Sequence, residues 1–166
     1  MALIRYFALL SILIAIVIGC QPPDCKNVDC GTCGNACCTL MWSFTPGKSA
    51  ADKIYQLMVT NFMKGGADHR YKFVKGSNLT TFKNPENVQY LLQAIHRTKV
   101  HKYNDTLNIA IYKMDNSTSV AKGFSISQIA GAYCDHGQNY KNLVGFVKGL
   151  GIQYKQRIVA GCPKPS

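Results

Sequence analysis

The residue types best suited to chemistry in this sequence are the cysteines, and six of the eight lie within residues 20–38, ending in the spacing Cys25-x4-Cys30-x2-Cys33-x3-Cys37-Cys38. Thiols this dense form disulfides, bind zinc or exchange disulfides. A redox C-x-x-C follows an apolar strand and opens a helix, and Cys30-Gly31-Thr32-Cys33 has neither flank. The adjacent pair at the end of the spacing fits one tetrahedral zinc site poorly. We therefore expect structural disulfides, with zinc and redox activity as alternatives, for Cys20, Cys25, Cys30, Cys33, Cys37, Cys38, Cys134 and Cys162.

Cys134-Asp135-His136 is a second concentration of reactive residue types. A cysteine nucleophile needs a free thiol with a base within reach, and side chains two residues apart rarely meet in that geometry. We expect Cys134 and Cys162 to pair with each other or to join the domain to the cysteine-rich segment. Asp135 or His136 would then cap the helix that follows. A small secreted enzyme that uses Cys134 or His136 is the alternative.

The remaining candidates for acid–base or metal chemistry are isolated. His69, His96 and His101 have no companion carboxylate at metal-binding spacing, and we expect them at the surface. The only glutamate is Glu86, and the seven aspartates are scattered along the chain. The sequence therefore predicts no catalytic residue, no metal site and no cofactor.

The first residues carry a targeting pattern. Residues 1–19 contain Arg5, then an apolar run and a small residue, as a secretory signal peptide does. Cleavage after Gly19 would leave eight cysteines, which can pair fully. An uncleaved anchor is one alternative, and lipid attachment at Cys20, which follows a lipobox-like Val-Ile-Gly, is another. Asn-x-Thr sequons favour a secreted glycoprotein, and they lie in predicted loops at Asn78, Asn104 and Asn116.

Composition predicts one basic domain. The chain has 166 residues, with 19 Lys and Arg against 8 Asp and Glu, a net charge of +11. Removal of residues 1–19 takes only Arg5 and leaves 18 basic residues against 8 acidic ones, net +10. Such a charge attracts sulfated glycans, acidic matrix or anionic lipid, whereas nucleic acid belongs to another compartment. The anion-binding candidates are Lys72, Lys75, Lys141, Lys155 and Arg157.

The order of apolar residues predicts the elements of residues 39–166, which follow the cysteine-rich segment 20–38. A helix begins at a capping box, Ser49-x-x-Asp52, and ends before Gly65-Gly66. A short strand covers residues 71–74. Asn84-Pro85 then starts a second helix whose apolar stripe is Val88, Leu91, Leu92 and Ile95.

The second half of this domain is predicted to contain a β-hairpin, a helix and a last strand. Apolar residues alternate over 107–112 and 120–126, on either side of a polar turn at 115–118. A third helix starts near Gln138, and Ile152, Tyr154 and Ile158 predict a last strand that ends near Gly161-Cys162-Pro163. We therefore expect an α+β fold in which helices cover one face of an antiparallel sheet.

The segment from Phe124 to Asn142 resembles the end of a small microbial domain family of unknown function. In that family a serine-rich strand leads through an Asp-x-Gly-x-Asn stretch into a closing helix, and the matching residues here are Asp135, Gly137 and Asn139. The resemblance covers about a tenth of the chain. It implies a fold and no activity.

Together these patterns predict a secreted, disulfide-stabilised glycoprotein that binds an anionic glycan or matrix polymer without catalysis. A structural matrix component is the further alternative. A membrane would be a partner only through a lipidated Cys20 or an uncleaved signal.

Overall fold

The computed structural model describes residues 36–44, 50–115, 118–129, 132 and 135–162. The predicted signal peptide, the first four cysteines, Ser49, Asn116 and Cys134 lie outside these residues. The described elements, in chain order, are β1 (Cys37–Phe44), α2 (Ala51–Met63), β2 (Tyr71–Asn78), β3 (Val88–Arg97), β4 (Asn104–Lys113), β5 (Ser119–Ser127), α3 (Gln138–Lys148) and β6 (Tyr154–Ala160).

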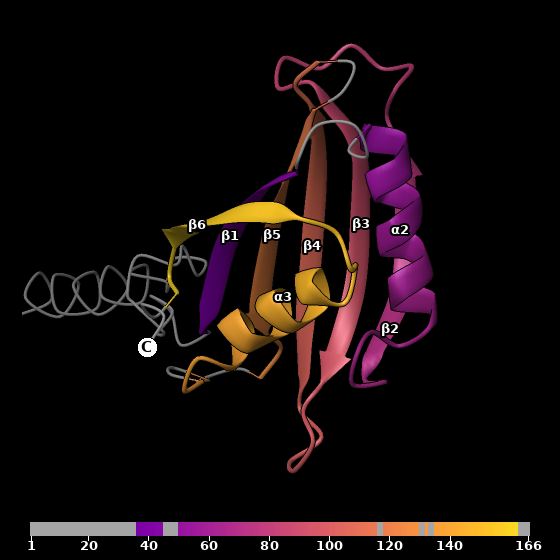
Figure 1. The fold of residues 1–166 in the computed structure, drawn as a ribbon. Coiled ribbons are helices and arrows are strands. Elements are labelled where there is room, and N and C mark those ends of the chain that lie inside the picture. The colour runs from indigo at the N-terminus through magenta and orange to yellow at the C-terminus, as the bar shows by residue number, and fades with distance from the viewer. Residues whose placement is uncertain (1–35, 45–49, 116–117, 130–131, 133–134, 163–166) are drawn as a thin grey trace, which may run out of the picture.

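The strands form one six-stranded sheet in the order β2-β3-β4-β5-β1-β6, and every neighbouring pair is antiparallel (Figure 1). β1 is inserted between β5 and β6, so the first and last strands of the domain lie side by side. With two helices beside this sheet, the described residues have the α+β composition that the sequence predicts, with sheet predominant.

Most of the predicted elements are confirmed, and one is wrong. The hairpin is β4–β5, the last strand is β6, and the first and third predicted helices are α2 and α3. The helix predicted from Asn84 to Ile95 is instead β3. Tyr90, Leu92, Ala94 and His96 are buried and alternate with less buried residues, which is the two-residue period of a strand. Hydrogen bonds to β2 and β4 on both sides make this strand central.

The hydrophobic core combines alternate strand residues with one side of each helix. Ile54, Met58 and Phe62 of α2 and Leu143, Phe146 and Val147 of α3 belong to the same buried cluster as Trp42. We call the side of the sheet that carries Trp42 and its in-register partners the core face. Gly123 of β5 lies on this face, where an added Cβ would collide with the Trp42 ring. The absence of a side chain at this position leaves room for the indole beside β5.

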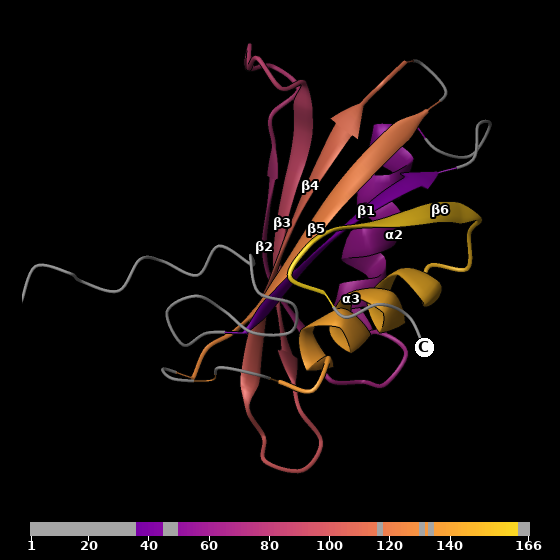
Figure 2. The same cartoon turned by 90° about the vertical axis from the view of Figure 1, so that its left-hand side faces the viewer.

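Figure 2, a view along another direction, shows α2 and α3 beside the sheet and β6 next to β1. α2 packs mainly against β2 and β3, and α3 packs against β5 and β1. None of the described helices is long and apolar enough to cross a membrane.

A disulfide joins Cys38, in β1, to Cys162, just after β6. This is the second of the two pairings that the sequence allowed for Cys162. Cys37 is disulfide-bonded as well, and none of the described cysteines is free. The Cys38–Cys162 bond spans 124 residues and so ties the start of the domain to its end.

We expect the double variant Cys38→Ala, Cys162→Ala to lose about 2–5 kcal/mol of unfolding free energy, because a cross-link over so long a loop restricts the unfolded chain strongly. Urea denaturation of the two proteins measures the difference. Non-reducing mass analysis must show that the remaining disulfides are unchanged. A loss below about 0.5 kcal/mol, the size of an ordinary surface substitution, would contradict this account of the bond.

Candidate functional site

A row of four polar side chains crosses the core face near one end of the sheet. Tyr71 of β2 pairs with His96 of β3, His96 pairs with Asp105 of β4, and Asp105 pairs with Ser127 of β5. All four residues are buried. Directly opposed residues on neighbouring strands have Cβ atoms about 4.5–5.5 Å apart, so this register places the four side chains in a continuous row.

The first turns of α3 supply hydrogen-bond partners to this row. Asn142 is 1% exposed, and its amide nitrogen donates to the Asp105 carboxylate at 2.8 Å. The amide oxygen of Asn142 accepts from Gln138 at 2.7 Å, and its backbone carbonyl accepts from the Tyr71 hydroxyl at 2.7 Å. Asn139 similarly donates to Ser127 Oγ at 3.1 Å. The helix is therefore fixed to the sheet through polar contacts at this end.

The loop before α3 shapes the start of the helix. The Asp135 carboxylate accepts from the Asn139 backbone N–H at 2.6 Å, as expected for a capping side chain. Gly137 has φ 74°, a left-handed conformation that glycine adopts without strain. His136 is exposed, and its carbonyl accepts from Lys141 Nζ at 3.0 Å. Cys134, the other residue of the alternative enzyme hypothesis, lies outside the described residues.

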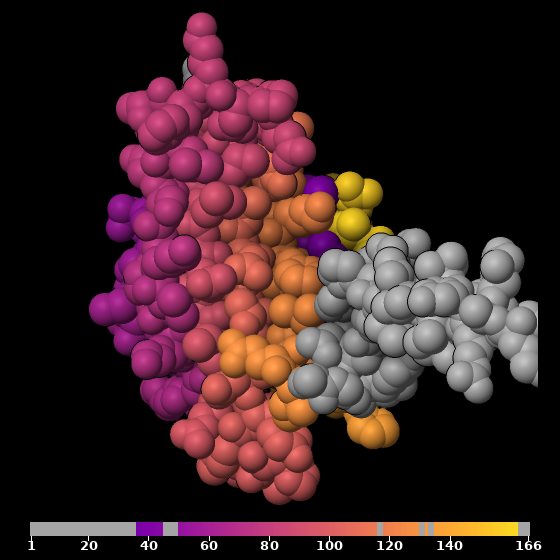
Figure 3. Space-filling view, turned by 180° about the vertical axis from the view of Figure 1, so that it is seen from behind, coloured from indigo at the N-terminus to yellow at the C-terminus, as the bar shows by residue number. Residues whose placement is uncertain are grey.

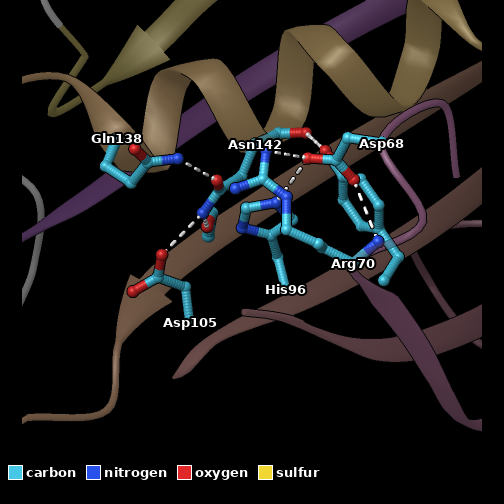
Figure 4. A network of polar contacts seen from close by, with 8 residues as sticks. Asp68, Arg70, His96, Asp105, Gln138 and Asn142 are labelled. Atoms are coloured by element: carbon cyan, nitrogen blue, oxygen red, sulfur yellow. Dashed lines mark hydrogen bonds and ion pairs between the residues drawn. The ribbon is translucent and has the colours of Figure 1, made fainter. Parts of the chain in front are cut away.

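His96 is the residue that differs most from expectation. The prediction of a surface histidine is wrong, since His96 is 2% exposed, whereas His69 and His101 are exposed as predicted. Its Nε2 lies 3.0 Å from Asp68 Oδ2, and its Nδ1 is buried with no hydrogen-bond partner. Figure 4 shows the His96 ring between Asp68 and Asp105, below α3.

The two carboxylates beside His96 have opposite pKa shifts. Partial burial raises the pKa of Asp68, but the hydrogen bond and charge of His96 and the contacts of Arg70 outweigh it and hold that pKa below 3.8. Arg70 Nη2 lies 2.6 Å from Asp68 Oδ2. For Asp105, burial outweighs the hydrogen bonds from Asn142 and Ser127 and the charge of His96, and it raises the pKa above 3.8. The charged form of Asp68 is thus stabilised, whereas burial disfavours the charged form of Asp105.

These residues line a cavity of about 750 Å³. Its floor is the polar row, one wall is α3, and its rim comprises the β3–β4 loop and the segment before α3. The rim supplies apolar surface from Val100, Ile129 and Ala132. Tyr103 and His101 stack on the rim with ring centroids 5.2 Å apart. No group of three or more described His, Cys, Asp or Glu residues is arranged to hold a metal ion.

The opposite face of the sheet gathers most of the predicted anion-binding residues. The register places Lys72 beside Ile95, Lys75 beside Gln93, Arg157 beside Met41 and Lys155 beside Ser43, all in the set of side chains that alternates with the core face. Lys122 joins them, between Ala110 and Met41. All five cations are exposed. We call the surface formed by Lys72, Lys75, Lys122, Lys155 and Arg157 the basic face.

The other predicted residues are placed apart from this face. Lys141 belongs to the cavity rim. Asn78 is the last residue of β2 and Asn104 is the first of β4, so both sequons begin at strand ends rather than in loops. Both asparagines are exposed. No family model and no curated protein matches this chain, and the functional argument therefore rests on the geometry of the described residues.

We expect Asn142→Ala to lower the unfolding free energy by about 2–4 kcal/mol, because it removes a donor from the buried Asp105 carboxylate and packing from a buried position. Lys141→Ala changes an exposed neighbour on the same helix turn and serves as the control, with an expected change within about 0.5 kcal/mol. Equal effects of the two substitutions in denaturant titrations would show that the Asn142 contacts do not stabilise the fold.

Proposed function

We propose that this chain is a secreted, disulfide-stabilised glycoprotein that binds an anionic extracellular glycan or matrix polymer along the basic face. The observation that carries the proposal is the placement of four of the five predicted anion-binding residues, together with Lys122, at outward positions of one sheet face.

The packing of the helices supports an accessible binding face. Both helices contribute to the single core cluster on the Trp42 side of the sheet. We infer that α2 and α3 cover the same face, so that neither of the described helices lies on the opposite one. Figure 3 views the molecule from that opposite side. A rod-like polymer needs such an open, elongated surface.

The charge pattern of this face supports an anionic partner. Asp105 is the only acidic residue in a described strand, and it lies on the core face. The outward positions of the described strands therefore carry cations and no carboxylate, and Glu86, from the loop before β3, borders this face beside Met41 and Tyr112. Unpaired cations at one surface add their fields, so they attract polyanions more strongly than the same residues paired with acids.

The dimensions also suit an extended ligand. Lys75 lies on the edge strand β2 and Arg157 on the opposite edge strand β6, so five strand spacings of about 4.8 Å separate them by about 24 Å. Lys122 lies between them on β5. A shallow hollow of about 450 Å³ contains Lys75 and Lys122 together with polar and aromatic side chains, among them Gln93, Asn108, Tyr112 and Phe124. Amide and aromatic groups beside cations provide contacts for sugar hydroxyls and ring faces as well as for anionic groups.

We expect immobilised heparin, a sulfated glycan, to retain the protein at physiological salt, and the double variant Lys122→Gln, Arg157→Gln to bind it more weakly. If each cation contributes about 1 kcal/mol near an anionic surface, the two substitutions weaken binding about 10- to 30-fold. Titration calorimetry with soluble heparin measures the affinities.

The control for this experiment is Lys53→Gln, Lys64→Gln, which removes the same charge from exposed positions on and just after α2. An equal loss of affinity in this control would show that net charge alone drives binding. A wild-type protein that flows through heparin at low salt would overturn the proposal.

The proposed secretion and glycosylation can be tested separately from glycan binding. We expect the protein from a secreting eukaryotic host to start at Cys20 and to carry N-glycans at its sequons, because Asn78 and Asn104 are exposed. Intact mass before and after glycosidase treatment, together with peptide mapping, measures both. A protein retained in the cells, or one secreted with every sequon unoccupied, would contradict this part of the proposal.

A further inference from the structure

The cavity on the core face has chemistry opposite to that of the basic face. Three of the six acidic residues in the described part of the chain, Asp68, Asp105 and Asp135, line it, although the chain as a whole carries a net charge of +11. Asp68 is paired with Arg70 and His96, and Asp135 caps α3. Asp105 has hydrogen-bond donors but forms no ion pair among the described residues, and the charge of the neighbouring His96 only partly offsets the effect of burial on its pKa.

The hydrogen bonding of His96 indicates which kind of chemical group this site could bind. The Asp68 carboxylate only accepts hydrogen bonds, so the Nε2 that contacts it carries the hydrogen. In the neutral ring, Nδ1 is then an acceptor, and it is buried without a donor. Leaving a buried acceptor unpaired is unfavourable, because the lost hydrogen bond to water is not replaced. His96 and Asp105 are direct cross-strand partners, so two acceptors short of a donor or a charge lie beside one another.

We propose that this cavity binds a small organic amine, whose ammonium group lies between His96 Nδ1 and the Asp105 carboxylate. An ammonium group has three N–H donors and no acceptor. It therefore supplies a hydrogen bond to each of the two acceptors and a positive charge to the carboxylate.

The cations that line the cavity do not already fill this role. The Arg70 guanidinium is bound to Asp68 at 2.6 Å, and Lys141 Nζ donates to the His136 carbonyl. Lys99 lies on the exposed β3–β4 loop. These groups hold the rim of the cavity and leave its floor acidic.

The walls suit the rest of such a ligand. Val100, Ile129 and Ala132 supply apolar surface, and the stacked rings of His101 and Tyr103 supply aromatic faces at the rim. A volume of about 750 Å³ lies in the range of small-molecule sites. The class of ligand is therefore a primary amine on a small apolar or aromatic body.

The test uses three probes of nearly equal size: 2-phenylethylamine, 2-phenylethanol and 3-phenylpropionate. Titration calorimetry with the intact, disulfide-bonded protein at neutral pH should give saturable binding of the amine and at least about tenfold weaker binding of the alcohol and the acid, since hydrogen bonds to charged groups are worth about 1.5–3 kcal/mol. Equal binding of all three probes, binding of the acid alone, or no binding of the amine would overturn the proposal.

The Asp105→Asn variant tests whether the negative charge of Asp105 is required for binding of the amine. The amide keeps an oxygen that can accept from Asn142 but has no negative charge, so binding of 2-phenylethylamine should fall at least about tenfold while the alcohol is unaffected. Asp52→Asn, at an exposed position on α2, is the matched control and should leave amine binding unchanged. Unchanged amine binding in folded Asp105→Asn would contradict the proposal.

A measurement on the wild-type protein avoids dependence on variant folding. The ¹⁵N resonance of His96 Nδ1 should shift on addition of 2-phenylethylamine as this atom gains a hydrogen-bond donor. It should not shift with 3-phenylpropionate. An Nδ1 resonance that does not respond to saturating amine would place the ammonium elsewhere and overturn the geometry proposed here.

Discussion

The constraint on which this structure depends is the two-residue period of its strands. Successive side chains of a strand point to opposite faces, and the pairing register extends this division across all six strands. One face receives Trp42, Leu92, Ile109 and their partners, which form the core with α2 and α3. The other receives the five cations of the basic face. A shift of one residue in any pairing would move charges into the core, so the register is held by burial and by charge together.

The polar row is the exception to this division, and hydrogen bonds from α3 compensate for its burial. Tyr71, His96, Asp105 and Ser127 occupy core-face positions where apolar residues would stabilise the fold more simply. Buried polar groups are acceptable only when they are hydrogen-bonded, and Asn139 and Asn142 of α3 supply most of the partners. Those asparagines are poor helix formers, so local helix stability is given up for contacts to the sheet. His96 Nδ1 is left without a partner in this network, and the proposed amine site assigns one to it.

An element of this fold can be predicted from the sequence only where its apolar residues clearly follow the period of a strand or of a helix. β4 and β5 alternate strictly, and α2 and α3 have well-placed apolar stripes, so these elements were found. The sequence predicts a helix at β3 because Leu91 and Ile95 add apolar residues on the outward face and complete a helical stripe by chance. Because a helix is predicted there, the sequence does not identify His96 as buried, although His96 follows Leu92 and Ala94 at two-residue spacing on the core face. Asp105 is likewise in phase with Leu107 and Ile109, and a polar residue in the phase of the core was the available signal for the site. These residues are brought together by the pairing of strands that are distant in the sequence, and such pairing has no signature in the spacing of residues.

The same separation of faces governs how the two proposed sites influence one another. A protein of net charge +11 repels a cationic ligand at long range, and a polyanion on the basic face would neutralise much of that charge. The two sites lie on opposite sides of a sheet, with side-chain layers that add to about 10 Å, close to the Debye length of about 8 Å at physiological salt. Electrostatic coupling between them is therefore favourable in sign, and the part of it that acts through solvent strengthens as salt is lowered. Because the intervening sheet is hydrogen-bonded along every strand pair, neither ligand needs to deform it, and the two faces can act as independent sites on one rigid support.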